Sequence, residues 1–132
     1  MAGVDLGIDL GTTKIIIYRR DKGIVLEEPS VVAYNTRSDK VDAVGHEALA
    51  MLGKTPAYIQ TECPIRDGVI SDHKYTEYLV KEFVRKVTKS YLIKPRIAIC
   101  IPSAITHVEA RAVVDAAMSA GARQVYLVDE PL

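Results

Sequence analysis

A short stretch near the N-terminus combines residue types that can bind phosphate. An acid, a glycine and two hydroxyls follow one another closely in Asp9-Leu10-Gly11-Thr12-Thr13-Lys14. Glycine lets the backbone approach a ligand closely, neighbouring amides can form an anion nest, and the threonine hydroxyls add donors. A carboxylate such as Asp9 is a hard oxygen ligand for Mg²⁺ or its waters. These six residues suit a phosphate-binding turn and an ordinary hairpin turn equally well.

A second pair of carboxylates, Asp129 and Glu130, lies near the end of the chain. They follow an apolar run, and ligands of α/β sheets usually bind at the carboxyl ends of strands. One carboxylate could orient an attacking water there. Alternatively, the acids begin a helix, where negative charge and a proline such as Pro131 are favoured. The residues alone favour the helix start.

A third segment, residues 85–96, carries aliphatic side chains between cations. Leu92 and Ile93 follow Tyr91, and the flanking cations are Arg85, Lys86, Lys89, Lys94 and Arg96. Aliphatic burial and nearby positive charge together suit an anionic lipid surface. The alternative is a solvated helix end whose Leu and Ile pack into the core, and the residues alone favour it.

Length and composition limit the remaining possibilities. The 132 residues are 48% hydrophobic and carry no net charge, which predicts one domain-sized core and no general attraction to nucleic acid. Cys63 and Cys100 are too few for a disulfide framework, and the histidines lack zinc-ligand spacing. With no readable signal peptide or membrane-length apolar run, we expect a reduced, cytoplasmic protein.

Hydrophobic periodicity predicts an α/β fold around a mixed sheet. Alternation and β-branched runs predict antiparallel strands first, with Pro29 at an edge or break, and then a parallel strand–helix–strand crossover. A small α+β insertion with a short helix at 47–52 interrupts the sheet. The predicted strands are 4–9, 13–18, 24–26, 30–34, 96–101 and 124–128, and the predicted helices are 72–89 and a second one that Thr106 and Glu109 begin with a capping box.

Six motifs together resemble the MreB-like family, the rod-shape-determining bacterial homologues of actin. They are Gly7–Thr13, Glu28–Ala33, Val44–Ala48, Met51–Pro56, Asp67–Asp72 and Asp129–Pro131. The first and last occur across the wider actin, Hsp70 and sugar-kinase superfamily, whereas the central ones are more specific to MreB-like proteins. The resemblance runs through essentially the whole chain, and an Hsp70-type chaperone ATPase half is the second choice.

The resemblance implies an actin-like, ribonuclease H-like fold, with subdomain IA in residues 1–34 and 72–132 and a subdomain IB-like insertion in residues 35–71. It also implies ATP and Mg²⁺ as cofactors. The implied roles are phosphate binding by Gly11, Thr12, Thr13 and Lys14, Mg²⁺ binding near Asp9, positioning of the hydrolytic water by Glu130, and membrane insertion by Leu92 and Ile93. Lys14 stands where the family usually has a small polar residue, so its amine either reaches a phosphate or points to solvent.

The family implies self-association into filaments at the inner face of the cytoplasmic membrane, contact with cell-wall elongation proteins, and no nucleic-acid partner. The sequence stops at Leu132, before the family's second phosphate loop and adenosine site. Whether this stretch hydrolyses ATP by itself therefore stays open. A stand-alone, non-catalytic interaction module of the same fold is the alternative function.

Overall fold

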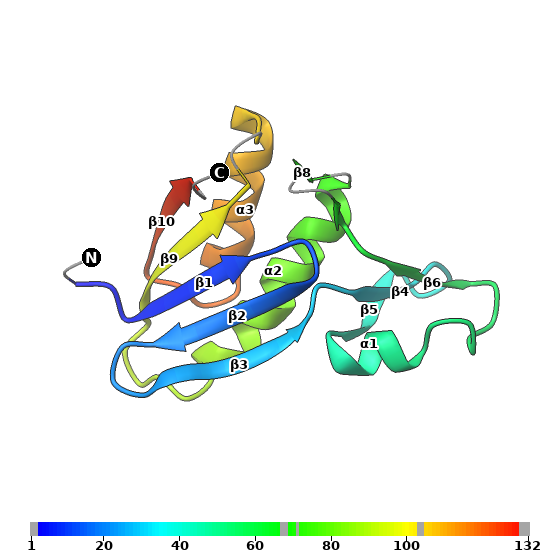
Figure 1. The fold of residues 1–132 in the computed structure, drawn as a ribbon, viewed down its shortest axis with the longest axis horizontal. Helices are drawn as coiled ribbons and strands as arrows, with labels where there is room; N and C mark the ends of the chain where they lie inside the picture. The colour runs from blue at the N-terminus through cyan, green and yellow to red at the C-terminus, as the bar shows by residue number, and fades with distance from the viewer. Residues whose placement is uncertain (1–2, 67–68, 71, 103–104, 130–132) are drawn as a thin grey trace.

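Five strands form the main sheet in the order β10-β9-β1-β2-β3 (Figure 1). The computed structural model describes residues 3–66, 69–70, 72–102 and 105–129. The strands are β1 (Leu6–Leu10), β2 (Lys14–Arg19), β3 (Gly23–Pro29), β9 (Arg96–Ile101) and β10 (Gln124–Asp129). The first three pair antiparallel through tight turns, whereas β9 and β10 run parallel to β1. This confirms the expected mixed sheet.

Two helices, α2 (His73–Thr88) and α3 (His107–Ser119), cover one face of this sheet (Figure 1). Every second residue of β1 is buried against them, which explains the apolar alternation in its sequence. Asp72 caps α2 by accepting from the Tyr75 amide at 3.1 Å, and Thr106 and Glu109 form the expected capping box of α3. Both helices therefore begin where the sequence predicted. No helix among the described residues is long and apolar enough to cross a membrane.

A second, three-stranded sheet lies beside the main one in the order β5-β4-β6. It contains β4 (Val32–Asn35), β5 (Lys40–Val44) and β6 (Ile59–Glu62), with the short helix α1 (His46–Ala50) after β5 and a hairpin of β7 (Ile65–Arg66) and β8 (Val69–Ile70) after β6. The expectation that residues 30–34 continue the main sheet was wrong. Pro29 ends β3 because it has no N–H for the ladder, and the chain then leaves for the second sheet. The subdomain division at residues 34 and 71 stays a prediction.

The two sheets contact each other at Glu28 and Gly45. One Glu28 carboxylate oxygen accepts from the His46 amide at 3.0 Å, and the other lies 3.9 Å from the Lys86 amine on α2. Gly45 has φ of 67° and ψ of −133°, a conformation available almost only to glycine. An added Cβ there would overlap the Glu28 carboxylate and come within 3.0 Å of the Phe83 ring. Two motifs that are distant in sequence therefore meet at one junction.

Candidate functional site

The turn between β1 and β2 is held by one buried serine. Ser30 Oγ donates to the Gly11 carbonyl at 2.8 Å, and the Ser30 amide donates to the Thr13 carbonyl at 3.1 Å. Ser30 is 1% exposed, and the Gly11 amide closes the turn by donating to the Lys14 carbonyl at 3.2 Å. Ser30, which precedes β4, therefore holds the turn through two hydrogen bonds. Sequence reasoning placed Ser30 in a family motif but assigned it no part in this site.

Gly11 is required in the turn because of close packing. An added Cβ would stand 2.8 Å from the Lys14 carbonyl oxygen, closer than real Cβ contacts come. Gly11 is not among the glycines with positive φ, so lack of space for a side chain, and not an unusual backbone conformation, requires glycine here. The expected close approach of this backbone to a ligand stays a prediction.

Asp9 lies near the end of β1, on the face of the sheet away from the buried Ile8 and Leu10. It is in register with Ile16 of β2 and Cys100 of β9, so its side chain sits over the middle of the sheet. Its Oδ1 atom is buried and has no hydrogen-bond partner among the described residues. A buried carboxylate oxygen without a donor is costly, and a cation or its bound water would relieve that cost.

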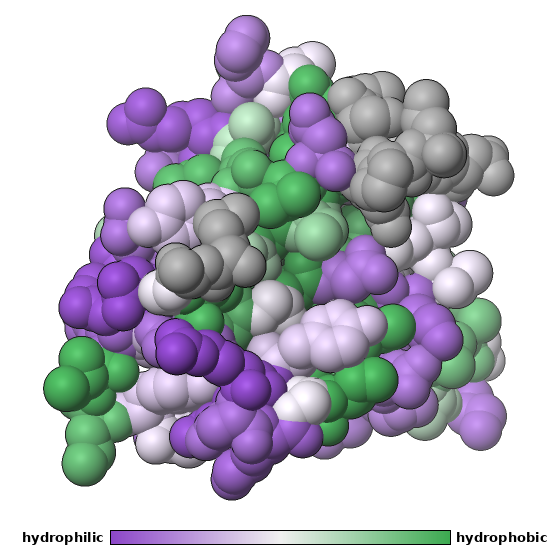
Figure 2. Space-filling view, turned by 60° about the vertical axis from the view of Figure 1, so that its left-hand side comes forward, coloured by the Kyte–Doolittle hydropathy of each residue, from purple (hydrophilic) through white to green (hydrophobic). Residues whose placement is uncertain are grey.

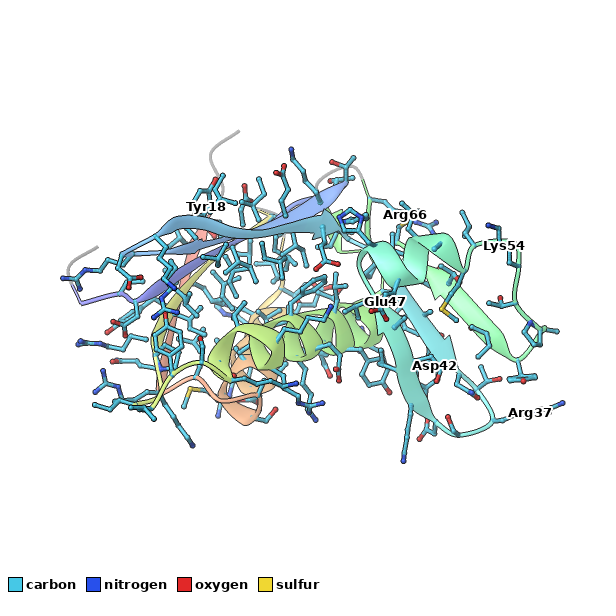
Figure 3. All side chains as sticks on the ribbon, turned by 90° about the horizontal axis from the view of Figure 1, so that it is seen from below. Tyr18, Arg37, Asp42, Glu47, Lys54 and Arg66 are labelled. Atoms are coloured by element: carbon cyan, nitrogen blue, oxygen red, sulfur yellow. The ribbon has the colours of Figure 1, made fainter. Side chains whose placement is uncertain are left out.

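A pocket of about 620 Å³ opens beside the turn, where the main sheet meets the second sheet and α1. Thr12 and Thr13 form one wall, and the remaining lining comes from Pro29, Val31, Leu49, Cys63, Ile65 and Arg66. Among the described lining residues, only Arg66, labelled in Figure 3, carries a positive charge. Its Nε donates to the Cys63 carbonyl at 3.2 Å. Sequence reasoning missed Arg66 as a site residue, although it directly precedes the Asp67–Asp72 motif.

Lys14 follows the turn but its amine is already paired. Lys14 Nζ lies 2.7 Å from a Glu27 oxygen on the neighbouring strand β3. The hydrogen bond and charge of Glu27 raise the pKa of Lys14, so the amine stays protonated. The Lys14 side chain is 53% exposed, so its amine lies at the surface while paired with Glu27. A contact with phosphate stays a prediction. Phosphate contact would require Lys14 to leave Glu27.

The remaining expected carboxylate, Glu130, lies outside the described residues. The last described residue, Asp129, ends β10 and is exposed. It pairs with Ile101 of β9, and β9 in turn runs parallel to β1. Asp129 and Asp9 therefore both lie near the carboxyl ends of parallel strands, one on each side of β9. This is the edge at which α/β sheets bind ligands.

Leu92 and Ile93 lie in the connection from α2 to β9, at the end of the main sheet away from the β1–β2 turn. Leu92 is fully exposed and Ile93 is 73% exposed. The alternative in which these side chains pack into the core is therefore wrong. On the face drawn in Figure 2, hydrophobic side chains project at the lower left beside strongly hydrophilic ones. Two neighbouring aliphatic side chains held in solvent are available to an apolar partner.

Known proteins are similar to this chain in sequence and in fold. The family described as MreB/Mbl protein matches residues 3–132. The cell shape-determining protein Mbl of Bacillus cereus is 49% identical over 128 residues, which cover 96% of this chain and 38% of that protein. The cell shape-determining protein MreB of Escherichia coli is 45% identical over 136 residues, covering 97% and 39% respectively. The chain thus spans about two fifths of the length of these relatives.

A solved structure extends the likeness to the fold. The crystal structure of MreB5 of Spiroplasma citri bound to ADP aligns with a TM-score of 0.75 and 31% identity, over 94% of this chain and 37% of that chain. This confirms the expected actin-like α/β fold. Because the family match runs through nearly the whole sequence, the chain belongs to the MreB/Mbl family.

Proposed function

We propose that this chain forms the N-terminal part of a nucleotide-dependent cytoskeletal protein, and that its β1–β2 turn binds the phosphates of ATP. The observation that carries the proposal is the buried, unpartnered Oδ1 of Asp9 at the base of a turn that Gly11 and Ser30 hold tightly. A related MreB5 structure is described as bound to ADP, which supports a nucleotide as the ligand.

The residues at the turn fit a nucleotide phosphate with Mg²⁺. Asp9 would hold Mg²⁺ or its waters. Thr12 and Thr13 line the adjoining pocket, and their amides and hydroxyls would donate to phosphate oxygens there. Bound Mg²⁺ would neutralise phosphate charge. Lys14 would add a cation only after exchanging Glu27 for a phosphate. Glu130 would position the water for hydrolysis, which needs the part of the family's fold that lies beyond this chain.

The wider function is shape determination through filaments. Membership in a family whose relatives are named cell shape-determining proteins supports a role in rod shape. We propose that the full-length protein polymerises on ATP, attaches to the inner face of the cytoplasmic membrane, and organises proteins of cell-wall elongation. The exposed Leu92 and Ile93 support membrane attachment, because water-exposed aliphatic side chains gain free energy by entering a lipid surface.

Nucleotide-dependent assembly tests the proposal. We expect the full-length protein to pellet in high-speed sedimentation with ATP and Mg²⁺, and to stay in the supernatant when nucleotide is withheld or Mg²⁺ is chelated. Light scattering over time would report the same difference. Equal pelleting with and without nucleotide would contradict the proposal and would favour the non-catalytic interaction module.

Replacing Leu92 and Ile93 together by serine should weaken binding to anionic vesicles. Each lost aliphatic side chain forfeits part of its transfer free energy of about 1.5–3 kcal/mol, so we expect roughly thirtyfold weaker partitioning. Vesicle co-sedimentation measures this. The matched control is serine at Leu52 and Val108, which are 58% and 75% exposed on other surfaces. Unchanged partitioning of the Leu92 and Ile93 variant would remove the membrane role of this loop.

A further inference from the structure

The loop that carries Leu92 and Ile93 contacts a second segment, the turn between β2 and β3. Arg19, at the end of β2, makes two contacts with this loop. Its Nη1 atom lies 3.4 Å from the Ser90 hydroxyl, and its guanidinium lies 4.6 Å from the centre of the Tyr91 ring. Figure 1 shows the β2–β3 turn and the α2–β9 connection at the same end of the molecule. The aliphatic pair therefore projects from a site that two distant segments build together.

Ion pairs engage three of the five cations that flank Leu92 and Ile93 in the sequence. Arg85 binds Glu82 at 3.0 Å, and Lys86 lies 3.9 Å from Glu28, so both are engaged along α2. Arg96 lies 4.0 Å from Asp5. Only two of the five flanking cations, Lys89 and Lys94, have no ion pair among the described residues.

The β2–β3 turn adds two cations at this end. Arg20 and Lys22 are exposed, and neither has an ion pair in the described part of the chain. Arg20 lines a pocket of about 240 Å³ together with Tyr91, which stands next to Leu92. The acids of that pocket are already engaged, since Asp21 binds Arg19 at 2.8 Å and Asp5 accepts from the Arg96 amide at 2.8 Å. We call the four unpaired cations the basic collar: Arg20, Lys22, Lys89 and Lys94.

We propose that the basic collar binds the phosphates of anionic lipid headgroups, and that the β2–β3 turn is the second half of the membrane-contacting surface. The proposal rests on the membrane attachment proposed above. Peripheral anchoring by one small apolar element is marginal, and a basic patch beside it supplies the second attraction that stable binding needs. The collar provides that attraction around the projecting Leu92 and Ile93.

A membrane fits this surface better than another polyanion does. A nucleic acid would meet the same positive charge, but it offers no apolar layer for two exposed aliphatic side chains. A single-stranded nucleic acid would gain further affinity only from aromatic side chains that are free for base stacking. The ring of Tyr91, next to Leu92, already has the Arg19 guanidinium over it, 4.6 Å from its centre.

The experiment replaces Arg20 and Lys22 together by alanine in the full-length protein and measures vesicle co-sedimentation. One set of vesicles contains neutral phosphatidylcholine alone, and in the other about a third of the lipid is anionic phosphatidylglycerol. We expect the double variant to bind the anionic vesicles about tenfold to thirtyfold more weakly than the unmodified protein. Raising the salt concentration should reduce this difference, because exposed charges are screened.

A matched control separates the collar from overall charge. Alanine at Lys40 and Lys54 removes the same charge from the start of β5 and from the segment after α1. Figure 1 shows β5 and α1 at the other end of the molecule from the β2–β3 turn. We expect this variant to bind anionic vesicles normally. Equal weakening of the two double variants would overturn the proposal, because the effect would then follow net charge.

The serine variant of Leu92 and Ile93 separates this proposal from the one it rests on. If that variant loses vesicle binding while the alanine variant of Arg20 and Lys22 binds normally, the loop is the membrane contact and the collar proposal is wrong. If the unmodified protein binds neither vesicle, membrane attachment itself fails and the collar proposal fails with it. ATP-dependent assembly without vesicles reports the nucleotide site independently of both.

Discussion

Alanine at Asp9 is expected to lower the affinity of the full-length protein for ATP with Mg²⁺ by at least about a hundredfold. Residues that only support a metal ligand typically contribute tenfold to a hundredfold in affinity, and Asp9 would contact the metal or its waters directly. The same change should leave the free energy of unfolding of the nucleotide-free protein unchanged or raise it by about 1 kcal/mol. The reason is that it removes a buried oxygen that has no partner among the described residues. Isothermal titration and thermal unfolding measure the two effects.

Asparagine at Asp9 tests whether the charge or the shape of the side chain is responsible for nucleotide affinity. It keeps the size of the side chain and removes the negative charge, so it should lose nucleotide affinity nearly as much as alanine does. The control is asparagine at Asp115, an exposed carboxylate on α3 that pairs with Arg111 at 3.4 Å. An Asp9 variant that binds ATP normally would show that the phosphate site lies elsewhere. Lost affinity accompanied by unfolding would assign Asp9 a structural role.

Alanine at Gly45 is expected to destabilise the fold by about 3–5 kcal/mol. A residue with a Cβ is strained by about 1–3 kcal/mol at a φ of 67° and ψ of −133°. The added carbon would also displace the Glu28 carboxylate from the His46 amide and press on the buried Phe83 ring, which adds an overpacking cost of about 1–3 kcal/mol. Domains of this kind have only about 5–15 kcal/mol in total. Urea unfolding of the full-length protein, followed by circular dichroism, measures the loss.

Gly53 provides the matched control for this substitution. Its φ of 74° is similar, but an added Cβ would have nothing within 4 Å. Alanine there should therefore cost only the backbone strain, about 1 kcal/mol. By these values backbone strain alone makes the two losses differ by at most about 2 kcal/mol, so a larger difference reports the packing at the junction of the two sheets. Equal losses at Gly45 and Gly53 would show that the contact with Glu28 and Phe83 contributes nothing to stability.

Elements whose signals are local were predictable from the sequence. The apolar alternation of β1 and the continuous run of β9 placed both strands to within two residues. The capping box of Thr106 and Glu109 placed the start of α3 because both of its hydrogen bonds join residues three apart. The acid and glycine of the first turn identified Asp9 and Gly11 as candidates, since residue types limit which chemistry a turn can perform.

Contacts between distant segments were decided only by the tertiary structure. Nothing local to residues 30–34 indicates which sheet they join, because a buried strand reads alike in either sheet. The partner of Lys14 is Glu27, thirteen residues away, and only the register of β2 against β3 brings the two together. Arg19 and Ser90 are separated by 71 positions.

The sequence by itself therefore determined the α/β class, most strand and helix positions, the family and the candidate phosphate turn. These depend on periodicity, capping and residue type, which act over a few neighbouring positions. The tertiary structure decided that Asp9 Oδ1 is left without a donor among the described residues and that Leu92 and Ile93 stand in solvent. It also decided that the β2–β3 turn lies at the same end of the molecule as these two side chains. Burial and ion pairing depend on which distant segments pack together, and local patterns do not specify that packing.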